Sequence, residues 1–382
     1  MSSKKLRVAV LYGGRSGEHE ISLQSAASVI RNLDPSKYEV IPVAIDKDGR
    51  WLLNDVSLIN NAARSGKSLP MFKDVPAVVL PPNPSAGEAN LISLGGSSPG
   101  SSRKVDVVFP VMHGPLCEDG TIQGLLELAD LPYVGCGVLA SAVAMDKEVA
   151  KRLARDAGIP IVPYVSVRHE TWLRSKSDTA ARVAGELGFP CFVKPVNMGS
   201  SVGVHKVKEP GALEAALTDS FRYDTKVLIE KAIAAREIEV SVLENSDPGL
   251  PPLASVAGEI IPHHEFYSYE SKYLDENGAA LLIPAKLNAE EMARVQKMAR
   301  EVFVALECEG MARADFFMDK VTSELYFNEV NTIPGFTSIS MYPKMWEASG
   351  LKYGELLSRL IDLAVSRHGR KKKLVRDFHQ NG

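Results

Sequence analysis

Closely spaced cysteines are missing from this sequence. It has four cysteines in 382 residues and no CxxC pair, so neither a zinc knuckle nor the disulfide framework of a small secreted protein is expected. An isolated cysteine behaves as a small apolar residue and is usually buried. We therefore expect core residues at Cys117, Cys136, Cys191 and Cys308.

Long apolar runs near the N-terminus are also missing. An apolar run covers only residues 6–12 before two glycines follow. This run is too short for the core of a signal peptide or for a membrane span. The sequence therefore predicts a cytoplasmic protein that has no membrane partner.

Neither sign of charge is in clear excess. Forty-four basic residues and 47 acidic residues give a formal net charge of −3, so the overall charge favours neither nucleic acid nor an anionic membrane as a partner. A basic run lies at residues 370–373. Such a run is more often a solvated helix end than a docking patch, and a helix end is expected here.

Two common phosphate-binding motifs are absent as well. The chain has no GxxxxGK[ST] sequence and no GxGxxG after its first expected strand. These are the glycine loops of P-loop proteins and of Rossmann dinucleotide-binding proteins. If the chain binds a nucleotide, other cations and backbone N–H groups must hold the phosphates.

The composition is that of a folded chain with more than one domain. Hydrophobic residues make up 45% of the 382 residues and charged residues 24%, and the chain is too long for one compact core. It begins as strand, glycine loop and helix, and further strands at 38–45 and 105–112 indicate an α/β domain with a Rossmann-like parallel sheet. Residues 81–104 are rich in Pro, Gly and Ser, which predicts a long surface excursion with little fixed structure.

The pattern changes after an amphipathic helix expected at residues 144–160. Short strands that often alternate follow this helix, which indicates antiparallel sheets over few helices. The last two strands, ARADFFMD and ELYFNEVN, are joined by a polar turn, and the helix GELLSRLIDLAVSRHG lies near the C-terminus. The expected architecture is an α/β domain followed by an α+β body.

The expected C-terminal hairpin carries a set of oxygen ligands. Period-two alternation places Arg313 and Asp315 on one face of the first strand, and Glu329 and Asn331 on one face of the second. A turn near Thr322 would bring Asp315 roughly opposite Glu329. Neighbouring carboxylates repel each other unless a cation or a shared proton lies between them, and oxygen donors without His or Cys suit Mg²⁺. From these residues alone, an acidic solvated hairpin is an equally good interpretation.

A small-residue loop follows the strand FVKPV. Lys194 lies near the end of this strand, before Gly199, Ser200, Ser201 and Gly203. Such a loop is flexible enough to fold over phosphates and to offer them backbone N–H groups. Taken alone it is more often a plain hairpin connection, but the nearby lysine and the acidic hairpin together favour a phosphate site.

Charged residues also mark the run KVLIEKAIAAREIEV. Glu230 and Lys231 end one expected strand, and Glu237 begins the next. The main chain of such a connection could contact a purine, and Glu237 could accept hydrogen bonds from ribose hydroxyls. Without further support, these residues are ordinary surface charges.

The motifs together resemble the D-alanine:D-alanine ligase family of the ATP-grasp superfamily. The resemblance covers nearly the whole chain and departs from the family mainly at residues 81–104. The matching motifs occur in the family's order and are GGRSGEHEIS, HGPLCEDGTIQGLLE, AMDKEVAKRL, FVKPVNMGSSVGV, LIEKAI, FYSYESKYL, ARADFF and NEVNTIPGFTSISMYP. The resemblance implies an α/β substrate domain at 1–140, a central ATP-grasp lobe at 141–228, a C-terminal ATP-grasp lobe with the metal and substrate site at 229–382, and a homodimer.

The resemblance implies ATP as a cosubstrate and two Mg²⁺ ions, which Mn²⁺ can replace. The implied metal ligands are Asp315, Glu329 and Asn331. The residues implied to bind ATP are Lys147, Lys194, Ser200, Ser201, Glu230, Lys231, Ile233, Glu237, Phe266, Lys272, Asn328 and Glu329. The aromatic segment 265–278 would close over ATP as a lid, although it could instead pack permanently on the body.

The implied reaction joins two D-alanine molecules for peptidoglycan synthesis, through a D-alanyl phosphate and a tetrahedral intermediate, and releases ADP and phosphate. The resemblance assigns stabilisation of the oxyanion to Arg313 and the N–H of Gly335. It assigns Glu18 and His113 to the binding of the first D-alanine. Glu18 could instead be present only because carboxylates favour helix N-termini, and His113 could be a structural hydrogen-bonding residue. The implied clamp for the second carboxylate is Ser340 with the N–H of Met341.

Tyr273 bears on the second substrate. In the family, a tyrosine at this position is linked through hydrogen bonds to residues matched here by Ser200 and Glu18, and it accompanies D-alanine rather than D-lactate. The catalytic set implied by the resemblance is Glu18, Ser200, Tyr273, Arg313 and Gly335. An ATP-grasp ligase for a different carboxylate and amine is the main alternative. A sensor without catalysis would predict loss of the metal ligands or of Arg313, and both are present.

Overall fold

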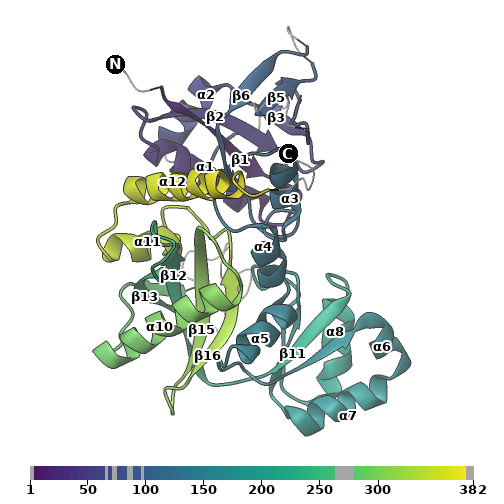
Figure 1. Cartoon of the computed structure of the whole chain (residues 1–382). Coiled ribbons are helices and arrows are strands. Elements are labelled where there is room, and N and C mark those ends of the chain that lie inside the picture. Colours follow the sequence, from purple (N-terminus) through teal and green to yellow (C-terminus); the bar gives the residue numbers. More distant parts are fainter. Residues whose placement is uncertain are drawn as a thin grey trace.

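The structure is a computed structural model that describes residues 4–64, 68–70, 75–83, 89–95, 99–262 and 279–375. It contains an N-terminal part, a central part and a C-terminal part, each built around a sheet of its own (Figure 1). Among the helices in the described part of the chain, none combines the length and apolarity needed to cross a bilayer.

The N-terminal part is an α/β layer structure, as predicted. Its sheet has the order β3-β2-β1-β7, in which β1 is parallel to both β2 and β7 and β3 is antiparallel to β2. A parallel sheet needs apolar cover on both faces, which explains the buried apolar run from Val8 to Tyr12 in the first strand. The elements are β1 (Leu6–Gly13), α1 (His19–Asn32), β2 (Tyr38–Ile45), β3 (Trp51–Leu53), α2 (Val56–Arg64), β7 (Val107–Val111) and α3 (Thr121–Leu128).

The expectation that residues 81–104 have little fixed structure is wrong for the residues described. A small antiparallel sheet runs through this region, formed by β4 (Val78–Val79), β5 (Ala89–Ser93) and β6 (Ser102–Val105). Leu91 is buried and packs into the core beside β1 and β2. The five residues of β5 lie among residues that are typical of turns, so the composition of the region predicted a loop where the chain forms a strand.

The central part is built on an antiparallel sheet of order β10-β9-β11-β8. Valines of β8 and β9 on one face pack against Trp172 and Val183. The helices α6, α7 and α8 were not predicted. The elements are β8 (Tyr164–Arg168), α6 (His169–Arg174), α7 (Lys176–Glu186), β9 (Cys191–Pro195), β10 (His205–Val207), the 3₁₀ turn η1 (Pro210–Ala212), α8 (Leu213–Ser220) and β11 (Lys226–Lys231).

The helix predicted at 144–160 is present as α5 (Lys147–Asp156). The first two residues of the predicted range belong to a separate helix, α4 (Val138–Met145). Asp146 separates them, because its carboxylate accepts a hydrogen bond from the backbone N–H of Val149 at 3.1 Å and so begins the second helix as an N-cap.

The C-terminal part contains an antiparallel sheet of order β14-β13-β12-β15-β16. α10 covers the apolar face of this sheet, and α11 packs against β12 and β13. Neither helix was predicted. The elements are β12 (Ala235–Leu243), β13 (Leu253–Pro262), β14 (Ala279–Leu282), α10 (Ala289–Ala305), β15 (Met311–Asp319), β16 (Leu325–Asn331), α11 (Met341–Ala348) and α12 (Tyr353–Lys371).

The last helix, α12, returns to the N-terminal part. In Figure 1 it lies across that part beside α1, and its leucines share a core with β1 and α1. Its basic end is not simply solvated, because Arg370 pairs with Glu244 at 3.2 Å and Lys371 with Glu127 at 2.8 Å. The four cysteines are free and buried, as predicted.

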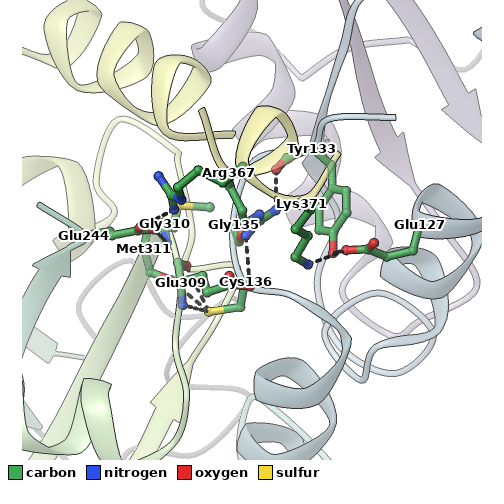
Figure 2. A network of polar contacts seen from close by, with 11 residues as sticks. Glu127, Tyr133, Gly135, Cys136, Glu244, Glu309, Gly310, Met311, Arg367 and Lys371 are labelled. Atoms are coloured by element: carbon green, nitrogen blue, oxygen red, sulfur yellow. Dashed lines mark hydrogen bonds and ion pairs between the residues drawn. The ribbon is translucent and has the colours of Figure 1, made fainter. Parts of the chain in front are cut away.

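Arg367 of α12 joins the N-terminal and C-terminal parts, as Figure 2 shows. Its guanidinium donates hydrogen bonds to the carbonyl oxygens of Gly135 at 2.5 Å and Tyr133 at 2.8 Å. It also lies 3.4 Å from a carboxylate oxygen of Glu309. The thiol of Cys136 adds a contact, donating to the carbonyl of Glu309 at 3.2 Å. These contacts fix the segment before β15 against the N-terminal part.

The variant Arg367→Met is expected to lower the free energy of unfolding by about 3 kcal/mol, because it leaves buried carbonyl acceptors without donors while roughly keeping the side-chain volume. Thermal unfolding of the whole chain followed by calorimetry would measure this loss. Arg359→Met, at an exposed position of the same helix, is the matched control and should change stability little. Equal melting temperatures for the two variants would contradict the role given to Arg367.

Candidate active site

The β15–β16 hairpin brings together the residues predicted as metal ligands. Asp315 pairs directly with Glu329, and Arg313 pairs with Asn331, so the predicted register is confirmed. The amide of Asn331 donates to a carboxylate oxygen of Asp315 at 3.0 Å. Among the described residues, no three His, Cys, Asp or Glu side chains converge as a metal site, so the candidate set has two carboxylates and one amide.

Arg313 is enclosed by acidic side chains. Its guanidinium donates to both carboxylate oxygens of Asp315, at 2.8 and 2.7 Å, and lies 3.0 Å from Glu239 of β12. Burial alone would lower the pKa of Arg313, but these carboxylates outweigh burial and raise the pKa well above its usual value. The guanidinium is therefore a fixed positive charge.

Glu239 was not predicted as a site residue. Alternation along β12 places it on the same face as Glu237, and its register position is opposite Asp315. Glu239 is buried, so it contributes negative charge inside the site. Period-two alternation from Glu237, which the sequence analysis had singled out, would have identified Glu239 as well.

Two lysines enclose the carboxylate of Glu230. Lys151 lies 2.7 Å from one carboxylate oxygen, and Lys194 pairs with the other. Burial would raise the pKa of Glu230, but the two positive charges outweigh burial and lower it. Lys194 also lies 3.3 Å from the side-chain oxygen of Asn328. The structure thus brings together three predicted residues and one, Lys151, that was missed.

Lys151 could have been found from its position in the sequence. It shares the buried stripe of α5 with Ala150 and Ala154, and a lysine on an apolar stripe needs a partner. Burial lowers the pKa of Lys151, although Glu230 partly offsets this effect. The lysine donates a further hydrogen bond to the carbonyl oxygen of Phe327 at 3.1 Å.

Lys147, the first residue of α5, connects the hairpin to the small-residue loop. Its ammonium group donates to the carbonyl oxygen of Met198 at 2.8 Å and lies 3.2 Å from Glu329. In the same loop, Ser200 and Ser201 have positive φ angles of +52° and +58°, a conformation that non-glycine residues seldom adopt. The loop is therefore held in an uncommon backbone conformation beside the acidic hairpin.

Glu18 enters the site from the N-terminal part. It precedes α1, and the hydroxyl of Ser200 donates a hydrogen bond to its carboxylate at 2.5 Å. Gly114 and Gly199 lie so close that a Cβ atom at either position would be 2.9 or 3.0 Å from the Glu18 carboxylate. The two glycines therefore leave room for Glu18 to reach across from one part of the chain to another.

His113 is a buried hydrogen-bonding residue. Its ring nitrogens lie 3.0 Å from the carbonyl oxygen of Ile333 and 3.2 Å from the hydroxyl of Ser25. Burial lowers the pKa of His113, but the nearby carboxylates of Glu118 and Glu18 outweigh burial and raise it. Glu118, in the motif HGPLCEDG, was missed. The sequence signal for Glu118 was its position only five residues after His113, which lies at the end of a strand.

The segment before α11 offers backbone donors. Ser340 precedes this helix, and its hydroxyl accepts from the N–H of Thr337 at 2.9 Å rather than capping the helix. A Cβ atom at Gly335 would lie 2.7 Å from the Ser340 hydroxyl oxygen, so only glycine permits this approach. Met341 is the first residue of the helix, where backbone N–H groups have no partner within the helix.

The remaining predicted residues fall into two groups. Lys231, Ile233 and Glu237 lie at the connection from β11 to β12, where Lys231 is exposed and the other two are half-buried. Phe266, Lys272 and Tyr273 lie outside the described residues, as does the expected lid at 265–278.

Comparisons with known proteins identify relatives over the whole chain. The family models "D-ala D-ala ligase N-terminus" and "D-ala D-ala ligase C-terminus" match residues 7–136 and 153–362. A D-alanine–D-alanine ligase A of Bradyrhizobium diazoefficiens is 57% identical over 98% of this chain and 99% of its own. A D-alanine–D-alanine ligase of Heliobacterium modesticaldum is 48% identical over 97% of each chain.

Solved structures agree with these relatives. The D-alanine–D-alanine ligase of Coxiella burnetii has a TM-score of 0.83 and is 37% identical, with 98% of each chain covered. The VanG D-Ala:D-Ser ligase of Enterococcus faecalis has a TM-score of 0.81 and is 36% identical, over 94% of this chain and 100% of its own. Sequence motifs, fold and relatives agree, and this chain belongs to the D-alanine–D-alanine ligase family.

Proposed function

We propose that this site joins two D-alanine molecules to D-alanyl-D-alanine at the expense of ATP, for peptidoglycan synthesis. The chain is a ligase that forms a C–N bond and uses ATP, as its family does. The assignment to this site rests on the contacts of the small-residue loop. Ser200 of the loop binds Glu18, while the carbonyl oxygen of Met198 in the same loop binds Lys147, which lies beside Glu329. The loop therefore connects the residue proposed for amino-acid binding to the acidic hairpin.

The proposed ATP site lies around Lys147 and Lys194. Lys147 and Lys194 would bind phosphate oxygens, and the loop at Ser200 and Ser201 would offer backbone N–H groups. Asn328 supports this role because it lies beside Lys194. The other residues proposed to contact the nucleotide are Glu230, Lys231, Ile233, Glu237, Phe266, Lys272 and Glu329.

The hairpin residues fit Mg²⁺ by the chemistry of their oxygen atoms. Asp315, Glu329 and Asn331 offer hard carboxylate and amide oxygens as ligands, with no imidazole or thiolate among them. Mg²⁺, or Mn²⁺ in its place, would neutralise phosphate charge and make the terminal phosphorus a better electrophile. Both carboxylate oxygens of Asp315 accept from Arg313 here. We expect Arg313 to turn toward the substrate when Asp315 binds the metal.

The proposed chemistry requires the carboxylate of the first D-alanine to be activated. A carboxylate oxygen attacks the γ-phosphorus, the bond from this phosphorus to ADP breaks, and an acyl phosphate forms. The amine of the second D-alanine then attacks the acyl carbon, and phosphate leaves after the amine has lost a proton. Arg313 and the N–H of Gly335 would stabilise the negative oxygen of the tetrahedral intermediate.

The two amino acids would be held by different parts of the chain. Glu18 would bind the ammonium group of the first D-alanine, near the buried His113. The N-terminus of α11 would hold the carboxylate of the second through the Ser340 hydroxyl and the N–H of Met341, since helix N-termini favour anions. Tyr273, through Ser200 and Glu18, is proposed to favour D-alanine as the second substrate.

Four further proposals concern the organisation, location and partners of the chain. They are a division into domains at 1–140, 141–228 and 229–382, a homodimer, a cytoplasmic location, and the absence of a nucleic-acid or membrane partner. Sedimentation equilibrium of the whole chain would test the dimer.

Release of phosphate from ATP in the presence of Mg²⁺ tests the proposed function. The reactions would contain D-alanine, L-alanine, D-alanine with D-lactate, or D-alanine with D-serine, and mass spectrometry would identify the products. We expect release with D-alanine alone and a D-alanyl-D-alanine product. Release only when D-serine or D-lactate is added would overturn the second-substrate assignment. No release from folded, ATP-binding protein would overturn the D-alanine assignment altogether.

A further inference from the structure

A cavity of about 500 Å³ lies at the edge of the central sheet. All five residues of β8 line it. Since successive side chains of a strand point to opposite faces, the cavity must run along the edge of the strand rather than over one face. The sheet order places β8 at this edge. Residues of α5 line one side and residues of α6 and α7 the other, and we call this cavity the β8 trough.

The backbone of β8 presents hydrogen-bonding groups to the trough. The N–H of Lys231 donates to the carbonyl of Pro163, and the N–H of His169 donates to the carbonyl of Thr225. In an antiparallel pair such bonded positions alternate with unbonded ones. The N–H and C=O groups of Tyr164, Ser166 and Arg168 therefore point away from β11, toward the open edge.

The walls of the trough are strongly basic. Arg152, Arg155, Arg168, Arg182 and Lys226 line it, against one acidic residue, Glu148. Lys226 is buried and pairs with Glu148 at 2.7 Å and with Asp146 at 2.6 Å, so the positive charge open to a ligand comes from the four arginines. The chain as a whole has a net charge of −3, so this concentration of positive charge is local.

Several of these cations are available to a ligand. Arg182 pairs with Glu186 at 2.8 Å, but both side chains are about half exposed. Arg155 and Arg168 have no ion-pair partner among the residues that the structure describes. Both are exposed, so neither is committed to a contact within the chain.

The charges are distributed unevenly between the two sides. Val165 and Val167 point into the core beneath α7, so Tyr164, Ser166 and Arg168 point toward the side of α5. Arg152 and Arg155 lie on that same side, because α5 carries them. The side of α7 contributes Arg182 together with neutral threonines. An extended ligand would therefore meet most of the positive charge on one face.

We propose that the β8 trough binds an extended acidic segment of a partner protein, which adds to the central sheet as a strand beside β8. The exposed N–H and C=O groups of β8 form the backbone hydrogen bonds to the added strand, and the arginines recognise acidic residues at every second position of that strand. A segment of five extended residues would span about 16 Å, matching the length of β8. The alternative is that the arginines only protect the strand edge against unwanted pairing.

Fluorescence anisotropy of a labelled seven-residue peptide tests the proposal. The peptide alternates Glu with Val, and the full chain is used with excess ATP and Mg²⁺ so that the nucleotide site cannot capture it. We expect saturable binding that weakens with salt and falls at least tenfold in Arg155→Ala/Arg168→Ala. Arg174→Ala, which changes an exposed arginine of α6 outside the trough, should bind the peptide as the native chain does. No binding, or equal binding by the double variant, would overturn the proposal.

Ser166→Pro separates strand addition from simple charge attraction. It removes an N–H that points to the open edge and leaves the bonds between β8 and β11 in place, a position where proline is tolerated. We expect at least tenfold weaker peptide binding with an unchanged rate of ligation. Unchanged peptide binding would overturn strand addition. If the variant does not fold, the native chain can be tested with the same peptide methylated on alternate backbone nitrogens, which cannot donate hydrogen bonds to β8. Equal binding of the methylated and unmethylated peptides would overturn strand addition.

Discussion

Glu329→Gln is expected to reduce the rate of ligation by about a thousandfold, which corresponds to about 4 kcal/mol of lost transition-state stabilisation. The change keeps the shape of the side chain and removes its charge. Glu329 faces Asp315 across the hairpin and lies 3.2 Å from Lys147, so its carboxylate is placed to contact both the proposed metal ion and the lysine proposed to bind phosphate. Steady-state phosphate release at increasing Mg²⁺ concentration would measure the effect.

The matched control for this variant lies on the same hairpin. Glu324→Gln changes an exposed carboxylate at the β15–β16 turn and should leave both the rate and the Mg²⁺ requirement unchanged. We expect Glu329→Gln to need a higher Mg²⁺ concentration for half-maximal activity. Native activity with an unaltered Mg²⁺ requirement would show that the hairpin does not bind the metal.

Arg313→Lys is expected to lower kcat/KM by a factor of about 10² to 10³, the usual loss when one donor to a developing oxyanion is removed. Lysine keeps the positive charge but cannot offer the planar fork of N–H donors with which arginine could contact the oxyanion while it still contacts Glu239. Because kcat should fall more than KM rises, the loss reports on the transition state rather than on uniform substrate binding.

Two measurements show whether this loss is specific. Arg294→Lys, at an exposed arginine of α10, should retain native kinetics. The dissociation constant of ATP should change little in Arg313→Lys, because Arg313 is assigned to the acyl group and not to the nucleotide. A large change in ATP affinity with an unchanged kcat would place Arg313 at the phosphates and contradict the proposed role.

The sequence was sufficient to predict the hairpin of the site. A strand has a fixed period of two, so the positions of Arg313, Asp315, Glu329 and Asn331 determined which side chains share a face. The register in the structure pairs Asp315 with Glu329. Local alternation and a single polar turn were enough, because the two strands are adjacent in sequence.

Two of the residues that were missed, Lys151 and Glu239, are charged groups buried by distant parts of the chain. Lys151 meets Glu230, and Glu239 meets Arg313, across different elements. A helix or strand pattern identifies a buried position, but it does not identify the partner that makes a buried charge tolerable.

Transfer of ¹⁸O from the D-alanine carboxylate to phosphate tests the central claim most directly, namely that this site activates a carboxylate by phosphorylation. D-Alanine labelled in both carboxylate oxygens would be incubated with ATP, Mg²⁺ and the full chain, and the released phosphate would be analysed by mass spectrometry. Attack of a carboxylate oxygen on phosphorus predicts one ¹⁸O in each phosphate released. Unlabelled phosphate, formed together with the dipeptide, would contradict the account.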